Sequence, residues 1–207
     1  MSTYPPEPWQ LRGQLFASAF LVPAGELTVD LPPGCALVRL RGRLVVGAIW
    51  VRYEPGGVLS YRELMTTVLV RRGLRVLPTI THIWVDSQAS RDGGRALWGI
   101  PKALAEFDFD ASRPGAHHFA ARDDSGPLAR GHVQATIGLP GRLPVRFKIV
   151  QWLDGCAKVS PVRSTAAVAL ARGGFEADPT GPLAFLAGRK PVASFVLRDF
   201  KMRFGGS

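Results

Sequence analysis

Of the residues in this sequence, Lys102 has the neighbours that best suit covalent chemistry. It ends the stretch Gly-Arg-Ala-Leu-Trp-Gly-Ile-Pro-Lys, and Ala103 and Leu104 follow it, so that most of its neighbours are apolar. A lysine in water is a solvated cation, and its amine becomes a nucleophile only where the environment disfavours the charge. Two interpretations follow. Lys102 is either a strand-end lysine whose ammonium lies in water, or a buried lysine with a reactive amine.

Glu63 is the second candidate, because it is a carboxylate within a run of β-forming residues. Strand alternation places it on one face with Tyr61 and Met65, opposite Arg62 and Leu64. An inward glutamate must find a partner or take up a proton, since burying a bare charge costs free energy. Glu63 is therefore either a rim residue paired with an arginine or an acid or base of a functional site.

The elements that must position these residues are mostly strands, within a single domain over residues 1–207. Nine segments are rich in branched or aromatic residues, many of them alternating, and turns rich in glycine and proline separate them. This spacing favours a closed barrel or sandwich over a doubly wound sheet. The predicted strands cover residues 15–22, 36–53, 58–71, 74–85, 117–122, 128–137, 145–152, 159–171 and 192–204.

One clear helix is predicted, over about residues 90–98. Ser87 or Ser90 is its N-cap, and Gly99 ends it. Lys102 would then lie just after the helix, at the start of a strand. Short helical structure is also predicted over residues 181–188.

The formal net charge of +10 is compatible with nucleic acid, a membrane surface or an acidic partner. The basic residues are dispersed, however, and no zinc-finger spacing, basic helix or RNA-binding signature accompanies them. No apolar run reaches the roughly 18–20 residues of a membrane span. We therefore expect that neither nucleic acid nor a membrane is a partner. We expect instead that the positive charge attracts an anionic substrate or an acidic carrier protein.

Other site classes have little support in the sequence. Cys35 and Cys156 form neither a disulfide framework nor a metal motif. The four histidines lack a partner at metal-ligand spacing, and no phosphate-binding glycine loop is present. Arg95 and Asp86 are expected to form a structural pair beside the helix. We predict a cytoplasmic protein with no secretory signal, metal or cofactor.

Four blocks of the sequence resemble the acetoacetate decarboxylase superfamily. Their order and spacing also match, the last block is the most specific, and together they cover about residues 4–110. The blocks are Pro5-Pro6-x-Pro8-Trp9-x-Leu11-x-Gly13, Tyr61-x-Glu63-Leu64, Ile83-Trp84-Val85-Asp86-Ser87 and Gly94-Arg95-x-Leu97-x-Gly99-Ile100-Pro101-Lys102.

The resemblance implies a mainly β fold: a cone-shaped, closed, largely antiparallel barrel with a few short helices and the active site inside. It also implies a homo-oligomer. Lys102 falls on the family's Schiff-base lysine and Glu63 on a glutamate of its active site. The residues expected to contact substrate are Gln14, Tyr61, Met65, Trp84 and Trp98.

Three positions depart from the family's pattern. Ala103 replaces a second lysine, Ala48 aligns with a second glutamate, and Gln14 aligns with a substrate-handling arginine. A neighbouring cation is one way to activate a lysine amine, and burial is the other. Burial alone can lower a lysine pKa by roughly 3–5 units, so imine chemistry survives these departures on energetic grounds. The departures at Gln14 and Ala48 favour a larger substrate than acetoacetate, such as a polyketide-like intermediate or one tethered to an acidic carrier.

The sequence therefore leaves three functions open. The first is a lyase that decarboxylates a β-keto acid through an imine on Lys102, with Glu63 as acid or base. The second uses the same lysine for aldol, dehydratase or cyclase chemistry on a larger carbonyl intermediate. The third is a non-catalytic binding barrel in which Lys102 pairs with an anionic ligand.

Overall fold

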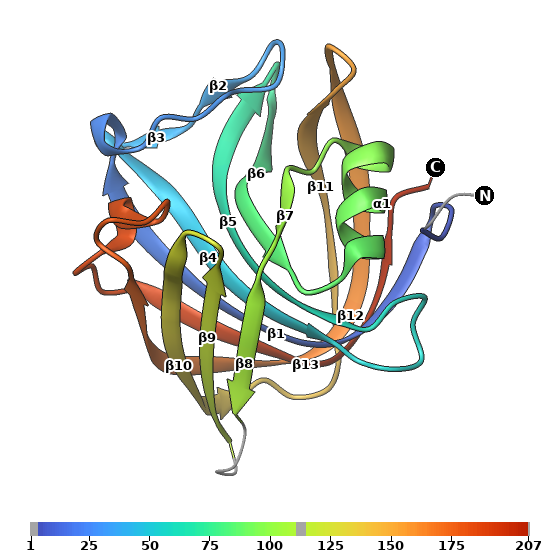
Figure 1. The fold of residues 1–207 in the computed structure, drawn as a ribbon, viewed down its shortest axis with the longest axis vertical. Helices are drawn as coiled ribbons and strands as arrows, with labels where there is room; N and C mark the ends of the chain where they lie inside the picture. Colours follow the sequence, from blue (N-terminus) through green and yellow to red (C-terminus); the bar gives the residue numbers. More distant parts are fainter. Residues whose placement is uncertain (1–3, 111–114, 207) are drawn as a thin grey trace.

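The fold is built around one large sheet, described by a computed structural model for residues 4–110 and 115–206 (Figure 1). Besides two short 3-10 turns, Ala24–Glu26 and Ala184–Leu186, the described residues contain one helix, α1 (Gln88–Trp98). The strands are β1 (Trp9–Pro23), β2 (Ala36–Leu37), β3 (Arg39–Leu40), β4 (Arg43–Tyr53), β5 (Tyr61–Arg72), β6 (Arg75–Val85), β7 (Lys102–Leu104), β8 (Glu106–Asp110), β9 (Ala116–Asp123), β10 (Gly126–Gly138), β11 (Leu143–Leu153), β12 (Cys156–Ala177) and β13 (Ala193–Phe204).

The prediction of a mainly β, largely antiparallel fold is confirmed, but the expected closure of the barrel is wrong. The hydrogen-bonded order is β7-β6-β5-β4-β1-β13-β12-β10-β9-β8, and the two end strands do not pair with each other. β7 is only three residues long and runs parallel to β6, with α1 as the crossover between them. β8 follows directly in the chain but pairs with β9. The sheet therefore curls strongly without forming a closed ring.

A side chain bridges the opening between β11 and β6. β11 branches from β12, and its Gln151 is buried against β6. The Gln151 amide accepts hydrogen bonds from Ile80 N at 2.8 Å and Thr79 Oγ1 at 2.6 Å, and it donates to Ile80 O at 3.1 Å. The amide thus makes the hydrogen bonds with the backbone N–H and carbonyl of Ile80 that a neighbouring strand would make. These bonds hold β11 beside β6, although the two strands form no hydrogen-bonded ladder.

Strand alternation divides the core into two apolar clusters on opposite faces of the sheet. On β4, Val46 and Trp50 belong to one cluster, whereas Val51 and Tyr53 belong to the other. The second cluster also contains Trp98 of α1. The helix therefore covers the same face of the sheet as Val51 and Tyr53.

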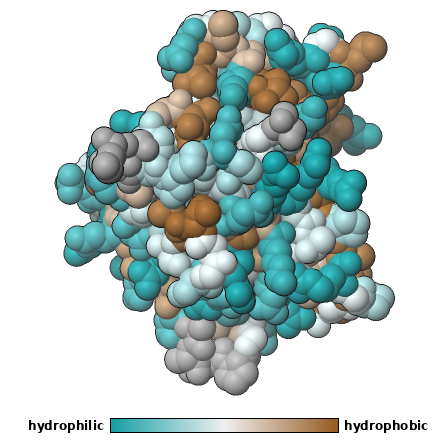
Figure 2. Space-filling view, turned by 90° about the vertical axis from the view of Figure 1, so that its right-hand side faces the viewer, coloured by the Kyte–Doolittle hydropathy of each residue, from teal (hydrophilic) through white to brown (hydrophobic). Residues whose placement is uncertain are grey.

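The first and last described residues lie close together near this helix (Figure 1). Glu7 Oε2 accepts hydrogen bonds from Trp98 Nε1 at 2.8 Å and from the backbone N–H of Gly206 at 3.3 Å. The face seen in Figure 2 is mostly hydrophilic, with its apolar residues in small separate patches. α1, the one α-helix of the described ranges, is too short to span a membrane.

Candidate active site

The turn after α1 brings Lys102 into the interior. Ser87 caps the helix by accepting a hydrogen bond from Ser90 N at 3.2 Å. Gly99 ends the helix in the left-handed region at φ 66°. A Cβ at Gly99 would lie 1.9 Å from the Trp152 carbonyl oxygen, so this close approach requires glycine. Lys102 then begins β7, and this residue is only 4% exposed.

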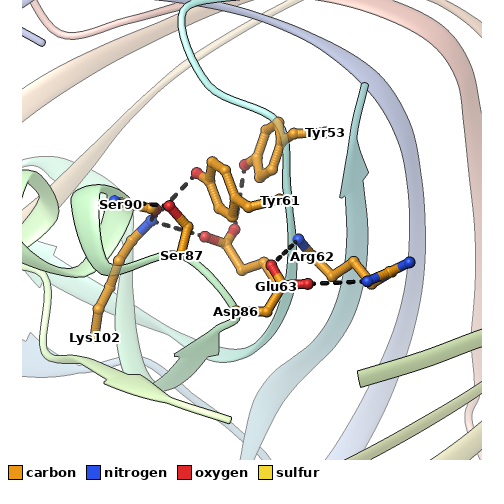
Figure 3. A network of polar contacts seen from close by, with 8 residues as sticks. All are labelled: Tyr53, Tyr61, Arg62, Glu63, Asp86, Ser87, Ser90 and Lys102. Carbon is orange, nitrogen blue, oxygen red and sulfur yellow. Dashed lines mark hydrogen bonds and ion pairs between the residues drawn. The ribbon is translucent and has the colours of Figure 1, made fainter. Parts of the chain in front are cut away.

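Three buried side chains, Tyr53, Tyr61 and Ser90, surround the Lys102 ammonium and its partner Glu63 (Figure 3). Lys102 Nζ donates hydrogen bonds to Glu63 Oε2 at 2.9 Å, Ser90 Oγ at 2.8 Å and Tyr61 OH at 3.3 Å. Tyr53 OH donates to the other oxygen of Glu63 at 3.2 Å. Glu63 is 1% exposed and Ser90 is fully buried. Glu63 thus forms a buried ion pair with Lys102, and it is not the rim residue of the alternative interpretation.

Burial and the neighbouring polar groups act on the ionisation of Lys102 in opposite directions. Burial lowers the pKa of Lys102, but the Glu63 carboxylate and Tyr61 raise it, so that the pKa stays above the ordinary lysine value. The apolar residues next to Lys102 in the sequence are therefore not the groups that surround its amine in space. In the free protein the amine is an ammonium ion.

The two tyrosines of the site remain protonated. Burial is the main reason that the pKa of Tyr61 rises to about 12 and that the pKa of Tyr53 lies well above its usual value. Tyr53 and Tyr61 are cross-strand neighbours on β4 and β5, with ring centroids 4.3 Å apart. Both phenols therefore stay neutral and hold hydrogens near the carboxylate of Glu63.

A cavity of about 250 Å³ opens beside this network. Lys102 and Glu63 are the only charged side chains among its lining residues in the described part of the chain. The rest of the lining is apolar apart from Tyr53, Tyr61 and Thr67. It consists of Trp9, Leu11, Leu15, Ile49, Met65, Pro78, Ile80, Ile83, Trp98, Ile100, Phe147, Ile149, Val162, Met202 and Phe204.

The structure brings three of the five expected substrate-contacting residues to this cavity. Tyr61, Met65 and Trp98 line it, as alternation along β5 and the position of α1 predict. Gln14 and Trp84 do not, so their expected placement is wrong.

Both misplaced residues lie on the far side of their strands. Ile83, the parallel partner of Lys102, faces the cavity, so the adjacent Trp84 packs in the opposite cluster and donates a hydrogen bond to Asp123 Oδ2 at 3.1 Å. On β1, Leu15 faces the cavity, whereas the Gln14 amide donates to Glu54 Oε1 at 3.1 Å.

Two of the departures from the family's pattern also lie outside the cavity. Ala48 belongs to the cluster that contains Trp84, and Ala103 packs against that cluster, on the face of the sheet opposite Lys102. On β4, the residue that pairs with Glu63 is Val51, which is fully buried and apolar. The cavity thus contains no second carboxylate and no second cation among its described lining residues.

Sequence reasoning missed Ser90 and Tyr53 as members of the site. With Ser87 as the N-cap, Ser90 lies at the third helical position, one turn before Gly94 and on the same helix face. Tyr53 and Tyr61 flank a turn rich in proline and glycine, so a hairpin there would have placed them opposite each other. The sequence thus contained a local signal for each residue.

Charged residues outside the cavity hold the site's backbone. Arg62 and Asp86 form an ion pair at 3.1 Å, and the Arg62 backbone N–H donates to Asp86 Oδ1 at 2.6 Å. Arg95 Nε donates to the carbonyl oxygen of Lys102 at 2.6 Å. The expected pair between Arg95 and Asp86 is therefore wrong, because each residue anchors a different strand. Within residues 4–110 and 115–206, no three His, Cys, Asp or Glu side chains are grouped to hold a metal ion.

Gly94 on α1 makes room for the side chain of Lys102, and Gly94→Ala tests this role. A Cβ at Gly94 would lie 2.8 Å from Lys102 Cδ and 2.9 Å from Cε. We expect alanine to displace the flexible lysine side chain and to slow amine chemistry by about 10- to 100-fold. The free energy of unfolding should change by less than about 1 kcal/mol, because alanine favours the helix.

The rate is measured as borohydride-trapped ketone adduct on Lys102, and unfolding is measured by urea titration. Ala96→Gly, on the exposed side of the same helix, is the matched control. It should lose about 1 kcal/mol of stability with an unchanged trapping rate. An unchanged rate in Gly94→Ala would show that the lysine position is not set by this contact.

Comparison with protein families assigns most of the chain. Residues 1–154 match the family model described as acetoacetate decarboxylase. A search of curated proteins found no match.

Solved structures share the fold over nearly the whole chain. An acetoacetate decarboxylase from Legionella pneumophila superposes with a TM-score of 0.75 at 19% identity, covering 99% of this chain and 88% of that one. An acetoacetate decarboxylase-like enzyme from Sphingomonas wittichii has a TM-score of 0.67 at 16% identity, with 96% and 91% covered. The enduracididine biosynthesis enzyme MppR, complexed with the condensation product of pyruvate and imidazole 4-carboxaldehyde, has a TM-score of 0.68 at 15% identity, with 98% and 88% covered.

Proposed function

Because the chain belongs to the acetoacetate decarboxylase family, we propose that it is a cofactor-independent carbon–carbon lyase that decarboxylates a β-keto acid through an imine on Lys102. One observation carries the proposal. Lys102 is buried, and its amine lies at an apolar cavity and 2.9 Å from a buried carboxylate that can take its proton. A surface lysine or a lysine that only binds anions needs neither of these features.

The first step is proton transfer within the pair. The Lys102 ammonium gives a proton to Glu63 Oε2, and the neutral amine attacks the ketone carbon of the substrate to form a carbinolamine. Glu63 then returns the proton to the departing hydroxyl, so that water leaves and a protonated imine remains. Tyr53, whose hydroxyl donates to Glu63 Oε1, keeps this carboxyl in place during the exchange.

The second step breaks the bond between the α-carbon and the carboxylate. The electron pair of that bond moves toward the iminium nitrogen, and carbon dioxide and a neutral enamine result. An anion and a cation disappear together, so apolar surroundings favour the transition state over the charged ground state. The enamine carbon takes up a proton from solvent, and water hydrolyses the imine to release the ketone and the amine.

A second candidate uses the same imine to form or rearrange carbon–carbon bonds. The ligand of MppR, a condensation product of pyruvate with an aldehyde, supports it as an alternative for this fold. The described lining residues include no second cation, which also supports it, since none of them besides Lys102 would hold a small keto acid by its carboxylate.

Borohydride reduction in the presence of β-keto acids and ketones tests the proposal. The mass of the intact protein should increase by that of an adduct from which the carboxylate has been lost. Peptide mapping should place this adduct on Lys102. Carbon dioxide should appear in the unreduced reaction. An adduct that retains the carboxylate, without carbon dioxide, would favour the second candidate. No adduct with any carbonyl compound would favour a non-catalytic binding barrel.

A further inference from the structure

The cavity has two chemically different ends. Glu63, Met65 and Thr67 face it from alternate positions of β5, so they are spaced about 7 Å apart along the strand. The hydrogen-bonding groups, including Lys102 and Tyr61, gather at the Glu63 end. Beyond Met65 the same face continues for about another 7 Å toward Thr67.

The walls of the far end are apolar. Ile49 on β4 is the cross-strand partner of Met65, and Ile83 on β6 is its partner on the other side. Further along β6, Ile80 pairs with Thr67, and both line the cavity. Among the described lining residues, Thr67 is the single polar side chain there, so this end offers almost nothing that could recognise a polar or charged substituent.

The cavity also has room beyond a four-carbon keto acid. A dry apolar cavity of roughly 150 Å³ holds benzene, with its six carbon atoms. On that scale the 250 Å³ measured here accommodates about ten non-hydrogen atoms. Acetoacetate has seven, so space for about three further carbon atoms remains. Phe147 lines the cavity yet is 43% exposed, so longer chains can reach solvent there.

We infer that the substrate is a β-keto acid whose ketone carries an unbranched apolar chain of about four carbons, lying along β5 between Ile49 and Met65. The inference rests on the proposed function, because it places the ketone carbon at Lys102. The carboxylate and ketone then occupy the polar end, while the chain fills the apolar end. Ile49 and Met65 set the chain length that fits.

Binding of 3-hydroxy acids tests the chain preference without any imine chemistry, because these analogues lack the ketone. Each methylene that enters the apolar end should tighten binding by about fourfold. Calorimetry should therefore give a Kd that falls about 60-fold from 3-hydroxybutanoate to 3-hydroxyheptanoate and then levels off. A Kd that changes less than twofold across the series would overturn the inference.

Two variants should move the preferred length in opposite directions. Ile49→Phe fills the apolar end and should weaken binding of 3-hydroxyheptanoate at least tenfold, with 3-hydroxybutanoate changed less than threefold. Met65→Ala enlarges it and should move the plateau to chains one or two carbons longer. Ile137→Phe, at a position 63% exposed outside the cavity, is the matched control and should leave the series unchanged. A uniform effect of Ile49→Phe on all lengths would contradict the assignment.

Carbon dioxide release from the matching 3-oxo acids separates this inference from the proposed function. Chain-dependent binding without carbon dioxide or a trapped adduct would reject the proposed reaction and support the substrate class. Carbon dioxide release with a flat length profile would support the reaction and overturn the substrate class.

Discussion

Lys102→Met is expected to abolish the borohydride-trapped adduct and to lower any decarboxylation rate by about 10⁴-fold or more. Lys102 is the only amine among the described lining residues of the cavity, and a nucleophile that forms a covalent intermediate has no substitute. Methionine keeps an unbranched side chain of similar length, so that α1 and its Gly94 contact retain their packing. Intact-protein mass and carbon dioxide release measure the two losses.

The same substitution should also destabilise the fold, which requires a control. Removing one member of a buried ion pair costs about 3–5 kcal/mol, because the remaining charge is left without a partner. Glu63 in Lys102→Met must either remain an unpaired buried carboxylate or take up a proton.

The double variant Lys102→Met/Glu63→Gln separates folding from chemistry. It removes both charges, so we expect it to recover most of the lost stability while it remains inactive. Urea unfolding of the wild type, both single variants and the double variant completes the cycle. Activity that returned with stability in the double variant would remove Lys102 from the mechanism.

Glu63→Gln should lower the rate of imine formation by about 10²- to 10⁴-fold while it leaves Lys102 in place. An amide has nearly the shape of the carboxylate and can still accept the hydrogen bond from Tyr53, but it cannot take the ammonium proton. The rate of adduct formation with a simple ketone measures this effect. Glu106→Gln, at a side chain 73% exposed, is the matched control and should not change the rate.

The same variant should lower the pKa of Lys102. Burial lowers this pKa and the Glu63 carboxylate opposes it, so removal of the carboxylate leaves burial as the larger influence. At a given pH below the pKa of Lys102, a larger fraction of the amine is then neutral in the variant than in the wild type. Acetylation of Lys102 by acetic anhydride, followed across pH by peptide mass, should begin at lower pH in Glu63→Gln than in the wild type. An unchanged profile would mean that the pair carries no charge.

The two effects of Glu63→Gln have opposite signs, which makes the variant informative. A lower lysine pKa alone would speed attack on a ketone near neutral pH, whereas loss of the proton acceptor and donor slows carbinolamine dehydration. We expect the second effect to dominate with ketones. Acetylation needs no dehydration, so it should report the first effect by itself.

Much of the local structure around the site could be predicted from sequence. The caps at Ser87 and Gly99 bound α1 because their chemistry acts within one helical turn. Alternation along β5 placed Tyr61, Glu63 and Met65 on one face, and all three line the cavity. Expectations based on position in a motif succeeded less well. Trp84 lies within a conspicuous apolar block, yet alternation on β6 turns it away from Lys102.

Sequence alone determined which residues are available and which face of its own strand or helix each one occupies, because these properties depend on neighbours within a few positions. Tertiary structure decided which faces meet. The pairing of β7 with β6 and the packing of α1 bring Lys102 to Glu63, 39 positions earlier in the chain. The same packing decided the charge of the amine. Ionisation of a buried group depends on the distance to its partners in space, and an apolar sequence context contains no information on that distance.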